Sequence, residues 1–184
     1  MSKKIILGIT ALLMTLTACN VDRPCDYDSG KNEVRCSEKT YKTVTINGNV
    51  WMAENLELYY TPGGDFCYND DFNNCPKYGR LYQYSETQKP ICPTGWRVPT
   101  KDELMDVMNG VGFDDINQKT GLNLVKSGFR YDDGKFVDEG ITASFWSATE
   151  FDESRAYMVR VTDSTVTAEH YNKTISASIR CIMK

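Results

Sequence analysis

Seven cysteines in a chain of 184 residues constrain the fold of this sequence more than any other feature. Six of them, all except Cys19, form an even set, which is typical of a disulfide framework in an oxidising compartment. Six cysteines allow fifteen pairings, and their spacing favours Cys25 with Cys36, Cys67 with Cys75, and Cys92 with Cys181. The first two bridges would close short polar loops, and the third would tie the middle of the chain to its C-terminal region. A structural zinc site is the competing interpretation, but the chain has one histidine and no close Cys-x-x-Cys pair.

Cys19 is set apart by the residues before it. Leu16-Thr17-Ala18-Cys19 form a lipobox behind Lys3, Lys4 and an apolar run over residues 5–15. That run has the length of a signal-peptide core and is too short to cross a bilayer as a helix. The pattern predicts a signal peptide over residues 1–18, lipidation of Cys19, and a polar tether over residues 19–38 ahead of a domain over residues 39–184. The protein would be exported and held in the bacterial envelope by its N-terminal lipid, in the outer membrane or at the cell surface. An ordinary secretory signal is the alternative.

The charge of the chain bears on its partners. Removing residues 1–18 takes away Lys3 and Lys4 but no acidic residue, so the formal net charge moves from −4 to −6. Basic residues are scattered singly, whereas phosphate contacts require a strongly basic face. The composition therefore argues against a nucleic-acid partner and is compatible with cations or with neutral ligands such as sugars.

The order of the expected elements predicts the fold class. Alternating residues on either side of Asn47-Gly48 predict a β-hairpin over residues 41–53, because both turn residues tolerate a positive φ. Thr100 and Glu103 form a capping box that predicts a helix ending at Asn109-Gly110, and a second helix is expected over residues 118–126. Further strands are expected over residues 128–131, 135–137, 143–147, 155–162, 166–171 and 176–182. A hairpin, then helices, then strands predicts an α+β fold with an antiparallel sheet, two helices and long disulfide-stapled loops.

Six short blocks carry a resemblance to a known family. They are Val50–Leu56, Cys67–Asp70, Tyr78–Tyr82, Cys92–Thr100, Phe145–Glu150 and Ser178–Cys181. In this order they resemble the Fibrobacter succinogenes major paralogous domain, over roughly Thr43 to Ile182. The resemblance implies a surface or secreted bacterial protein, often a lipoprotein, whose biochemical activity is undefined.

A more distant resemblance concerns the fold. Gly95–Thr100 with Glu103, and the closing Ile179–Cys181, are similar to elements of formylglycine-generating enzymes and their C-type-lectin-like relatives. This resemblance implies a C-type-lectin-like fold, which a Cys92–Cys181 bridge would fit, but a likeness of fold transfers no function.

Neither function carries over residue by residue. The enzymes use a pair of reactive, copper-binding cysteines on the C-terminal side of the domain, where this chain has only Cys181. The calcium-dependent lectins use a Glu-Pro-Asn or Gln-Pro-Asp loop and a Trp-Asn-Asp strand, and both are missing here.

Two loops hold the candidate ligand-binding residues. Tyr68, Asp70 and Asp71 lie in a loop rich in Gly, Asp and Asn, and Asp132 and Asp133 lie in a turn before Gly134. Tyrosine offers contact area and a hydrogen-bonding tip, and the carboxylates, with Asp65, could supply oxygen ligands to a structural calcium ion. The metal-binding residues are otherwise unknown, and no other cofactor is expected. Solvated turns explain the aspartates equally well, and neither stretch has the spacing of a known calcium loop.

Other residue types leave further alternatives open. Trp51, Trp96 and Trp146 could stack on sugars, but large aromatic residues in strands are more often core. His170, the single histidine, could serve a catalytic pair, although the cysteines are expected to be bridged. Carboxylates available to a glycoside hydrolase are Glu54, Glu86, Glu103 and Glu150, with Glu103 already assigned to the capping box.

These observations together favour a non-catalytic lipoprotein of the cell envelope. We expect a binding module for polysaccharide or another extracellular ligand, with contacts from the loops at residues 65–74 and 132–139. One alternative is a structural or protein-interaction role with an envelope protein as partner, and another is a carboxylate-based glycoside hydrolase.

Overall fold

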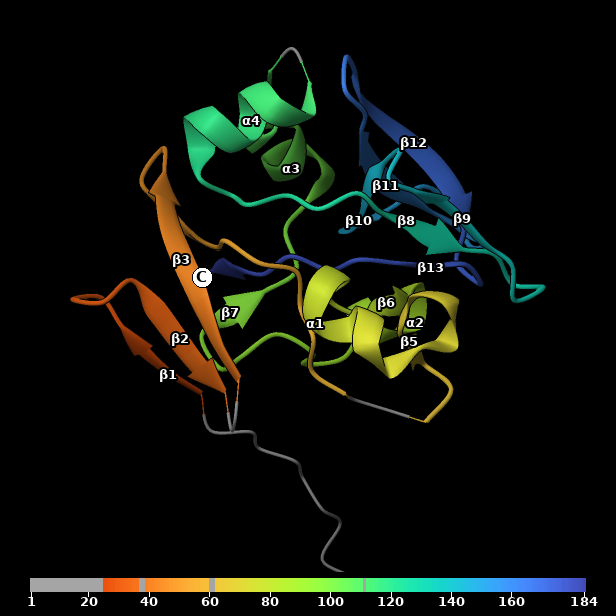
Figure 1. Ribbon diagram of the computed structural model, residues 1–184, viewed down its shortest axis with the longest axis horizontal. Helices are drawn as coiled ribbons and strands as arrows, with labels where there is room; N and C mark the ends of the chain where they lie inside the picture. The colour runs from red at the N-terminus through yellow and green to blue at the C-terminus, as the bar shows by residue number, and fades with distance from the viewer. Residues whose placement is uncertain (1–24, 37–38, 60–61, 111) are drawn as a thin grey trace, which may run out of the picture.

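A computed structural model of the chain describes residues 25–36, 39–59, 62–110 and 112–184. In this part of the chain the fold is mixed α+β, with mostly strands and a few short helices, which confirms the predicted class. The strands form two sheets rather than the single sheet that we expected. In Figure 1 the first three strands lie on the left, β8 to β12 lie on the right, and α3 and α4 lie at the top between them. In these described ranges no helix is long and apolar enough to cross a membrane.

The first sheet joins the start of the described chain to its end. Its order is β1-β2-β3-β4-β14-β7. The strands are β1 (Cys25–Asp28), β2 (Glu33–Cys36), β3 (Lys39–Ile46), β4 (Asn49–Met52), β7 (Trp96–Arg97) and β14 (Ile182–Met183). Asn47 and Gly48 turn the chain between β3 and β4 with φ of 51° and 80°, as the sequence predicts.

The segment that we expected to be a polar tether contains a β-hairpin. β1 pairs with β2, and β2 pairs with β3, so residues 25–36 extend the first sheet. Val34 and Cys36 are fully buried in the core. The sequence did not predict this hairpin because only Val34 and Cys36 of the four-residue strand β2 are buried. Two buried positions are too few to be recognised as an alternating strand pattern in a polar sequence. The domain boundary at residue 39 remains a prediction.

The second sheet carries the long hairpins. Its order is β12-β11-β10-β8-β13-β6-β5, with β9 paired to β8. The strands are β5 (Asp65–Phe66), β6 (Leu81–Gln83), β8 (Ser127–Arg130), β9 (Phe136–Glu139), β10 (Ala143–Glu150), β11 (Arg155–Val161), β12 (Val166–Asn172) and β13 (Ser176–Ala177). Most pairs are antiparallel, as predicted, but β10 and β8 run parallel.

The expected strand over residues 176–182 is divided between the two sheets. β13 belongs to the second sheet and β14 to the first, and the chain crosses the core between them. Arg180 is fully buried at this crossing, where its guanidinium donates to the carbonyls of Met52 (3.2 Å) and Leu122 and to the side-chain oxygen of Asn55. Burial lowers the pKa of Arg180 to about 9, so the group stays charged at neutral pH. Three acceptors at one cation thus fix the crossing.

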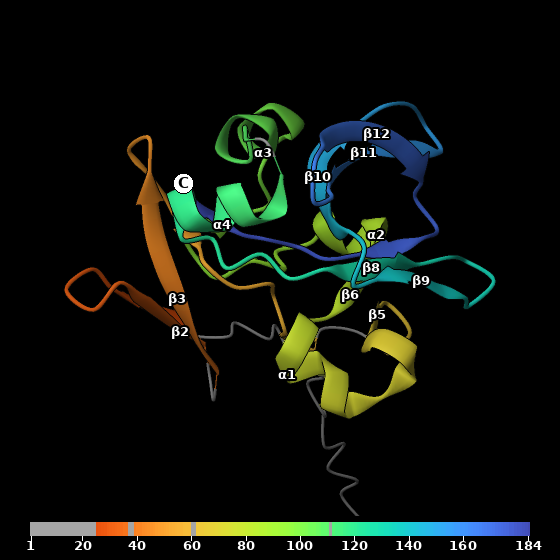
Figure 2. The same ribbon diagram turned by 45° about the horizontal axis from the view of Figure 1, so that its top comes forward.

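Two helices lie beside each other between β3 and the strands β10 to β12 (Figure 2). α3 (Lys101–Val107) begins at the predicted capping box, with both reciprocal hydrogen bonds between Thr100 and Glu103. α4 (Phe113–Thr120) lies earlier than the helix expected over residues 118–126, because Gly121 adopts the left-handed conformation and ends it. Single turns of helix form α1 (Cys75–Tyr78) and α2 (Tyr84–Thr87), and short 3-10 turns form η1 (Tyr68–Asp70) and η2 (Phe72–Asn74).

The three predicted disulfides are confirmed, and they link Cys25 to Cys36, Cys67 to Cys75, and Cys92 to Cys181. The tryptophans are core residues rather than exposed stacking surfaces, because Trp51, Trp96 and Trp146 are at most 4% exposed. Together the bridges and the buried rings hold a rigid base under the loops that reach the surface.

Candidate binding groove

A groove of about 570 Å³ is lined mainly by the segment over residues 87–98. Cys25, Leu58, Ala148 and Lys184 contribute its other walls. Ligand sites in proteins have volumes of about 300–1,000 Å³, so the groove is large enough for a small molecule or for part of a polymer.

The segment over residues 87–98 is held in place at several points. The disulfide joins Cys92 to Cys181 with a Cα–Cα distance of 5.9 Å. The amide of Trp96 donates to the carbonyl of Pro93 (2.8 Å) and closes a turn in which Gly95 has a φ of 83°. The amide of Lys184 donates to the carbonyl of Gly95 (2.8 Å). A wall fixed in this way loses little conformational freedom when a ligand binds.

The groove has an apolar floor and a polar rim. Leu58, Ile91 and Val98 are buried beneath it. The exposed rim side chains are Gln88, Lys89, Thr94 and Lys184, with half-buried Arg97 beside them. Lys89 and Arg97 pair with Glu86 (2.7 Å) and Glu103 (2.5 Å), which reduces the charge that they present. An apolar floor with a few hydrogen-bonding groups suits a neutral, amphipathic ligand.

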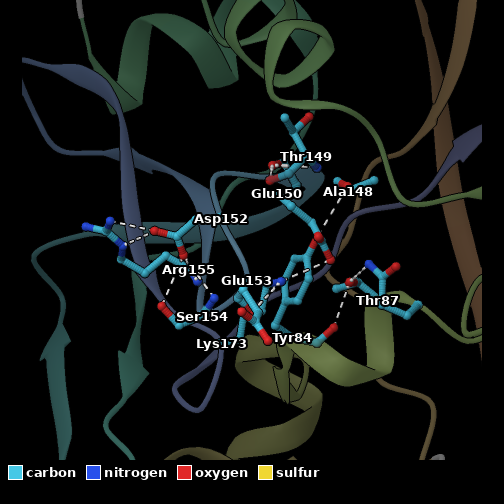
Figure 3. A network of polar contacts seen from close by, with 12 residues as sticks. Tyr84, Thr87, Ala148, Thr149, Glu150, Asp152, Glu153, Ser154, Arg155 and Lys173 are labelled. Atoms are coloured by element: carbon cyan, nitrogen blue, oxygen red, sulfur yellow. Dashed lines mark hydrogen bonds and ion pairs between the residues drawn. The ribbon is translucent and has the colours of Figure 1, made fainter.

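A chain of hydrogen bonds connects the segment over residues 87–98 to β10 through Tyr84 (Figure 3). The Tyr84 hydroxyl donates to the carbonyl of Ala148 (3.2 Å), and the Thr87 hydroxyl donates to the carbonyl of Tyr84 (2.7 Å). Gln88 donates in turn to the Thr87 oxygen (3.0 Å). Burial raises the pKa of Tyr84, so the hydroxyl keeps its proton and remains a donor. Both Thr87 and Ala148 line the groove, and the network therefore fixes one of its walls.

Ion pairs order the β10–β11 turn itself. Lys173 pairs with Glu150 (3.1 Å) and donates to the carbonyl of Glu153 (3.0 Å). Asp152 accepts hydrogen bonds from the Ser154 amide (2.9 Å) and from the Arg155 side chain (2.5 and 2.8 Å). The Arg155 guanidinium holds the pKa of Asp152 well below its usual range. The turn is therefore rigid and carries both signs of charge.

The four carboxylates considered for hydrolysis have separate partners. Glu86 pairs with Lys89, and Glu150 pairs with Lys173. Glu103 forms a two-pronged pair with Arg97 (2.7 and 2.5 Å) that, with the amide of Thr100, lowers its pKa to about 2. One oxygen of Glu54 is buried without a hydrogen-bond partner, and Glu54 interacts electrostatically with Arg180. A general acid of a glycosidase needs a raised pKa, and the pKa of Glu103 is shifted in the opposite direction.

Comparison with known proteins finds a family match over part of the chain. Residues 44–115 match the Fibrobacter succinogenes major domain. No curated protein and no solved structure matches the sequence. The matched residues run from β3 to the first turn of α4. They include most of the groove wall and both members of the Arg97–Glu103 ion pair.

The matched residues also contain the first set of candidate ligand residues, but these residues do not line the groove. Tyr68 is buried and packs against Tyr78 and Phe136, with ring centroids 6.0 and 5.1 Å away. Asp71 accepts from the backbone and side chain of Asn73 (2.9 Å each), so it caps η2, whereas Asp70 is exposed. This loop is closed by the disulfide between Cys67 and Cys75.

The second set lies beyond the matched domain, in the β8–β9 turn. Asp133 accepts from the amide of Lys135 (2.9 Å), and Asp132 accepts from the hydroxyl of Thr174 (3.2 Å). The two loops meet through Tyr68 and Phe136, but in the described part of the chain no three His, Cys, Asp or Glu residues are placed to hold a metal ion. The aspartates act as turn-stabilising acceptors there.

Two surface features were not predicted from the sequence. The groove was not predicted because residues far apart in the chain form it. The sequence does indicate that its wall is a loop, since Pro90, Pro93 and Gly95 are typical of loops. Phe151 was missed as well: it is 43% exposed and stacks on His170, with ring centroids 4.0 Å apart. His170 is thus an aromatic neighbour and has no cysteine beside it in a catalytic pair, because the six described cysteines form disulfides.

Proposed function

We propose that this protein is a non-catalytic binding module of the bacterial cell envelope and that its groove binds a neutral polysaccharide. The observation that carries the proposal is the groove of about 570 Å³, which has an apolar floor of Leu58, Ile91 and Val98 and a rim of hydrogen-bonding side chains. Pyranose rings have the same duality, since their C–H faces are apolar and their hydroxyls lie at the edge. A preformed site with this lining binds without a large cost in ordering.

The proposed location rests on the sequence and on the disulfides. The lipobox ending at Cys19 lies outside the described residues, and the lipid anchor is part of the proposal. Three disulfides are consistent with export to an oxidising compartment. The anchor would hold the folded residues at the outer membrane or the cell surface, where they would meet extracellular polysaccharide.

A C-type-lectin-like fold is the architecture that we propose. Two observations support it: sheets with α3 and α4 alongside, and a Cys92–Cys181 bridge that joins the middle of the chain to its C-terminal strands. Function is argued from the groove and not from this likeness.

Retention on insoluble polysaccharides tests the proposed function. The full chain, purified in mild detergent, is incubated with cellulose, xylan, mannan and chitin, and the bound fraction and any released sugars are measured. We expect saturable retention on at least one polymer without release of sugars. Thr94 is an exposed rim residue, so Thr94→Trp should fill the groove and weaken retention by about tenfold or more.

The matched control places the same change elsewhere. Thr167 is exposed on β12 and lies outside the groove, and Thr167→Trp should leave retention unchanged. Retention on none of the polymers would overturn the proposal and favour a structural or protein-interaction role. Release of sugars would replace it with the carboxylate-based hydrolase.

A further inference from the structure

Phe151 is an exposed aromatic ring on a well-ordered turn. It directly follows β10 and begins the turn that Asp152, Ser154 and Arg155 stabilise. The ring is 43% exposed, whereas the aromatic residues at the other end of β10, Phe145 and Trp146, are fully buried. An exposed ring of this size on a fixed turn is available to a ligand.

Three neighbours support the ring from one side and from its edge. His170 stacks on it at 4.0 Å with an interplanar angle of 19°, and the Arg155 guanidinium lies 4.6 Å from its centroid. Arg155 and His170 approach each other to 3.4 Å. If His170 and Arg155 lay on opposite faces of the Phe151 ring, 4.0 and 4.6 Å from its centroid, their nitrogen atoms could not be 3.4 Å apart. His170 and Arg155 therefore leave the opposite face of Phe151 uncovered.

Tyr157 completes the support. Its ring lies 5.5 Å from Phe151 and nearly perpendicular, at 86°, and 6.4 Å from His170. These distances place Tyr157 beside the edge of Phe151, and not opposite His170. The uncovered face and the 43% exposure thus describe an aromatic platform, which we define as Phe151 backed by His170, Arg155 and Tyr157.

Polar groups stand around the platform. Glu150 precedes Phe151 and its side chain is 51% exposed, while the side chains of Asp152 and Arg155 are 36% and 38% exposed. Carboxylate oxygens accept from hydroxyl groups and the guanidinium donates to them. The π face of an aromatic ring carries partial negative charge and attracts C–H groups. A flat apolar face ringed by hydroxyls, as in a neutral pyranose, matches both requirements.

We propose that the Phe151 platform is a stacking subsite for one pyranose ring of the polysaccharide whose neighbouring residues occupy the groove. This inference rests on the proposed function. Ala148 lines the groove and lies three residues before Phe151. A stretch of three residues spans at most about 11 Å, which a short oligosaccharide can bridge.

Calorimetric titration with soluble hexasaccharides tests the subsite. Cellohexaose, xylohexaose, mannohexaose and chitohexaose serve as probes with the full chain in detergent. The hexasaccharide that the unaltered protein binds should bind about tenfold more weakly to Phe151→Ala, since this change removes the stacking surface. Phe151→Trp should bind within about threefold of the unaltered protein or more tightly.

Phe72→Ala is the matched control, because Phe72 is 77% exposed on the separate loop closed by Cys67 and Cys75. It should leave the affinity unchanged. The single imidazole of the chain, His170, provides a second readout. Its proton NMR signals should move on addition of the bound hexasaccharide to the unaltered protein and stay in place for Phe151→Ala.

The outcomes separate this inference from the proposed function. If Thr94→Trp weakens binding but Phe151→Ala does not, the platform is not a subsite and the groove still binds. If Phe72→Ala weakens binding as much as Phe151→Ala, the loss is not specific to the platform and the inference is wrong. If the unaltered protein binds none of the probes and none of the polymers, both proposals fail.

Discussion

Glu103 combines two local roles in one carboxylate. It completes the capping box of α3 through the amide of Thr100 (2.8 Å), and it pairs with Arg97 at the edge of the groove. Capping residues are recognisable in the sequence because the partners are three positions apart. The pairing with Arg97 also joins residues close in sequence, but nothing in the spacing specifies that β7 turns Arg97 toward the helix.

We expect Glu103→Gln to lower the stability of the protein in a pH-dependent way. The pKa of Glu103 is lowered to about 2 in the folded protein, below its ordinary value of 4.5. A lowered carboxyl pKa contributes stability above the unfolded value and loses it as the pH falls toward the folded value. Glutamine keeps the capping geometry but not the charge, and the pair is partly exposed, so the loss at pH 7 should be about 1 kcal/mol.

Urea unfolding of both proteins at a series of pH values measures this loss. The difference in unfolding free energy should be constant above about pH 5 and shrink toward zero near pH 2. Asp102→Asn changes a neighbouring carboxylate whose side chain is 82% exposed, and it should alter stability by less than about 0.5 kcal/mol. A Glu103→Gln difference that stayed the same at low pH would contradict the assignment.

At the level of the elements, local signals predicted some features and missed others. The Asn47-Gly48 hairpin and the start of α3 were correct because two to four adjacent residues determine them. The second helix was placed too late, because Gly121 had been taken as part of the helix although its left-handed conformation ends α4. The division of residues 176–182 between two sheets was missed, since it depends on acceptors for Arg180 that lie more than 50 positions away.

The three disulfides should differ in their effect on stability. Cys92 and Cys181 are 89 positions apart, whereas Cys67 and Cys75 are 8 apart. Because a longer closed loop restricts the unfolded chain more, replacing the first pair by alanine should cost about 4–5 kcal/mol and the second about 2.5 kcal/mol. Urea unfolding of the two double variants measures both values.

Hydrogen exchange gives the local counterpart of that experiment. Loss of the Cys92–Cys181 bridge should speed amide exchange in the groove wall over residues 87–98, because the bridge is one of its main attachments. Loss of the Cys67–Cys75 bridge should leave exchange in that wall unchanged. Equal destabilisation by the two double variants, with the same exchange in the wall, would refute the proposed hierarchy.

For the whole molecule, the cysteine count and the family resemblance predicted more than the residue types did. The pairing of six cysteines and the mixed α+β class were correct, and the Fibrobacter succinogenes major domain is matched over residues 44–115. The candidate groove was not located, because Cys25, Ala148 and Lys184 meet there only after folding. Acidic loops drew attention in the sequence, but their carboxylates bind neighbouring turn atoms.

Calcium should therefore have no effect on this protein. In the described residue ranges no three acidic, histidine or cysteine side chains gather at one point, and Asp71 and Asp133 already accept local hydrogen bonds. Thermal unfolding and polysaccharide retention should be the same in EDTA and in millimolar calcium. A calcium-dependent rise in Tm, abolished by Asp70→Asn or Asp132→Asn, would show that the acidic loops bind the ion.

The long disulfide also determines when the groove can exist. An exported chain enters the oxidising compartment with its N-terminal end first, and Cys92 arrives 89 residues before Cys181. Before Cys181 arrives, Cys92 lacks its native partner, while Cys25, Cys36, Cys67 and Cys75 are already present as competing partners. The two short bridges, Cys25–Cys36 and Cys67–Cys75, can close early and remove these four competitors. The wall of the groove is thus among the last parts to mature, and a disulfide isomerase that corrects early pairings would determine how much of the protein acquires a complete groove.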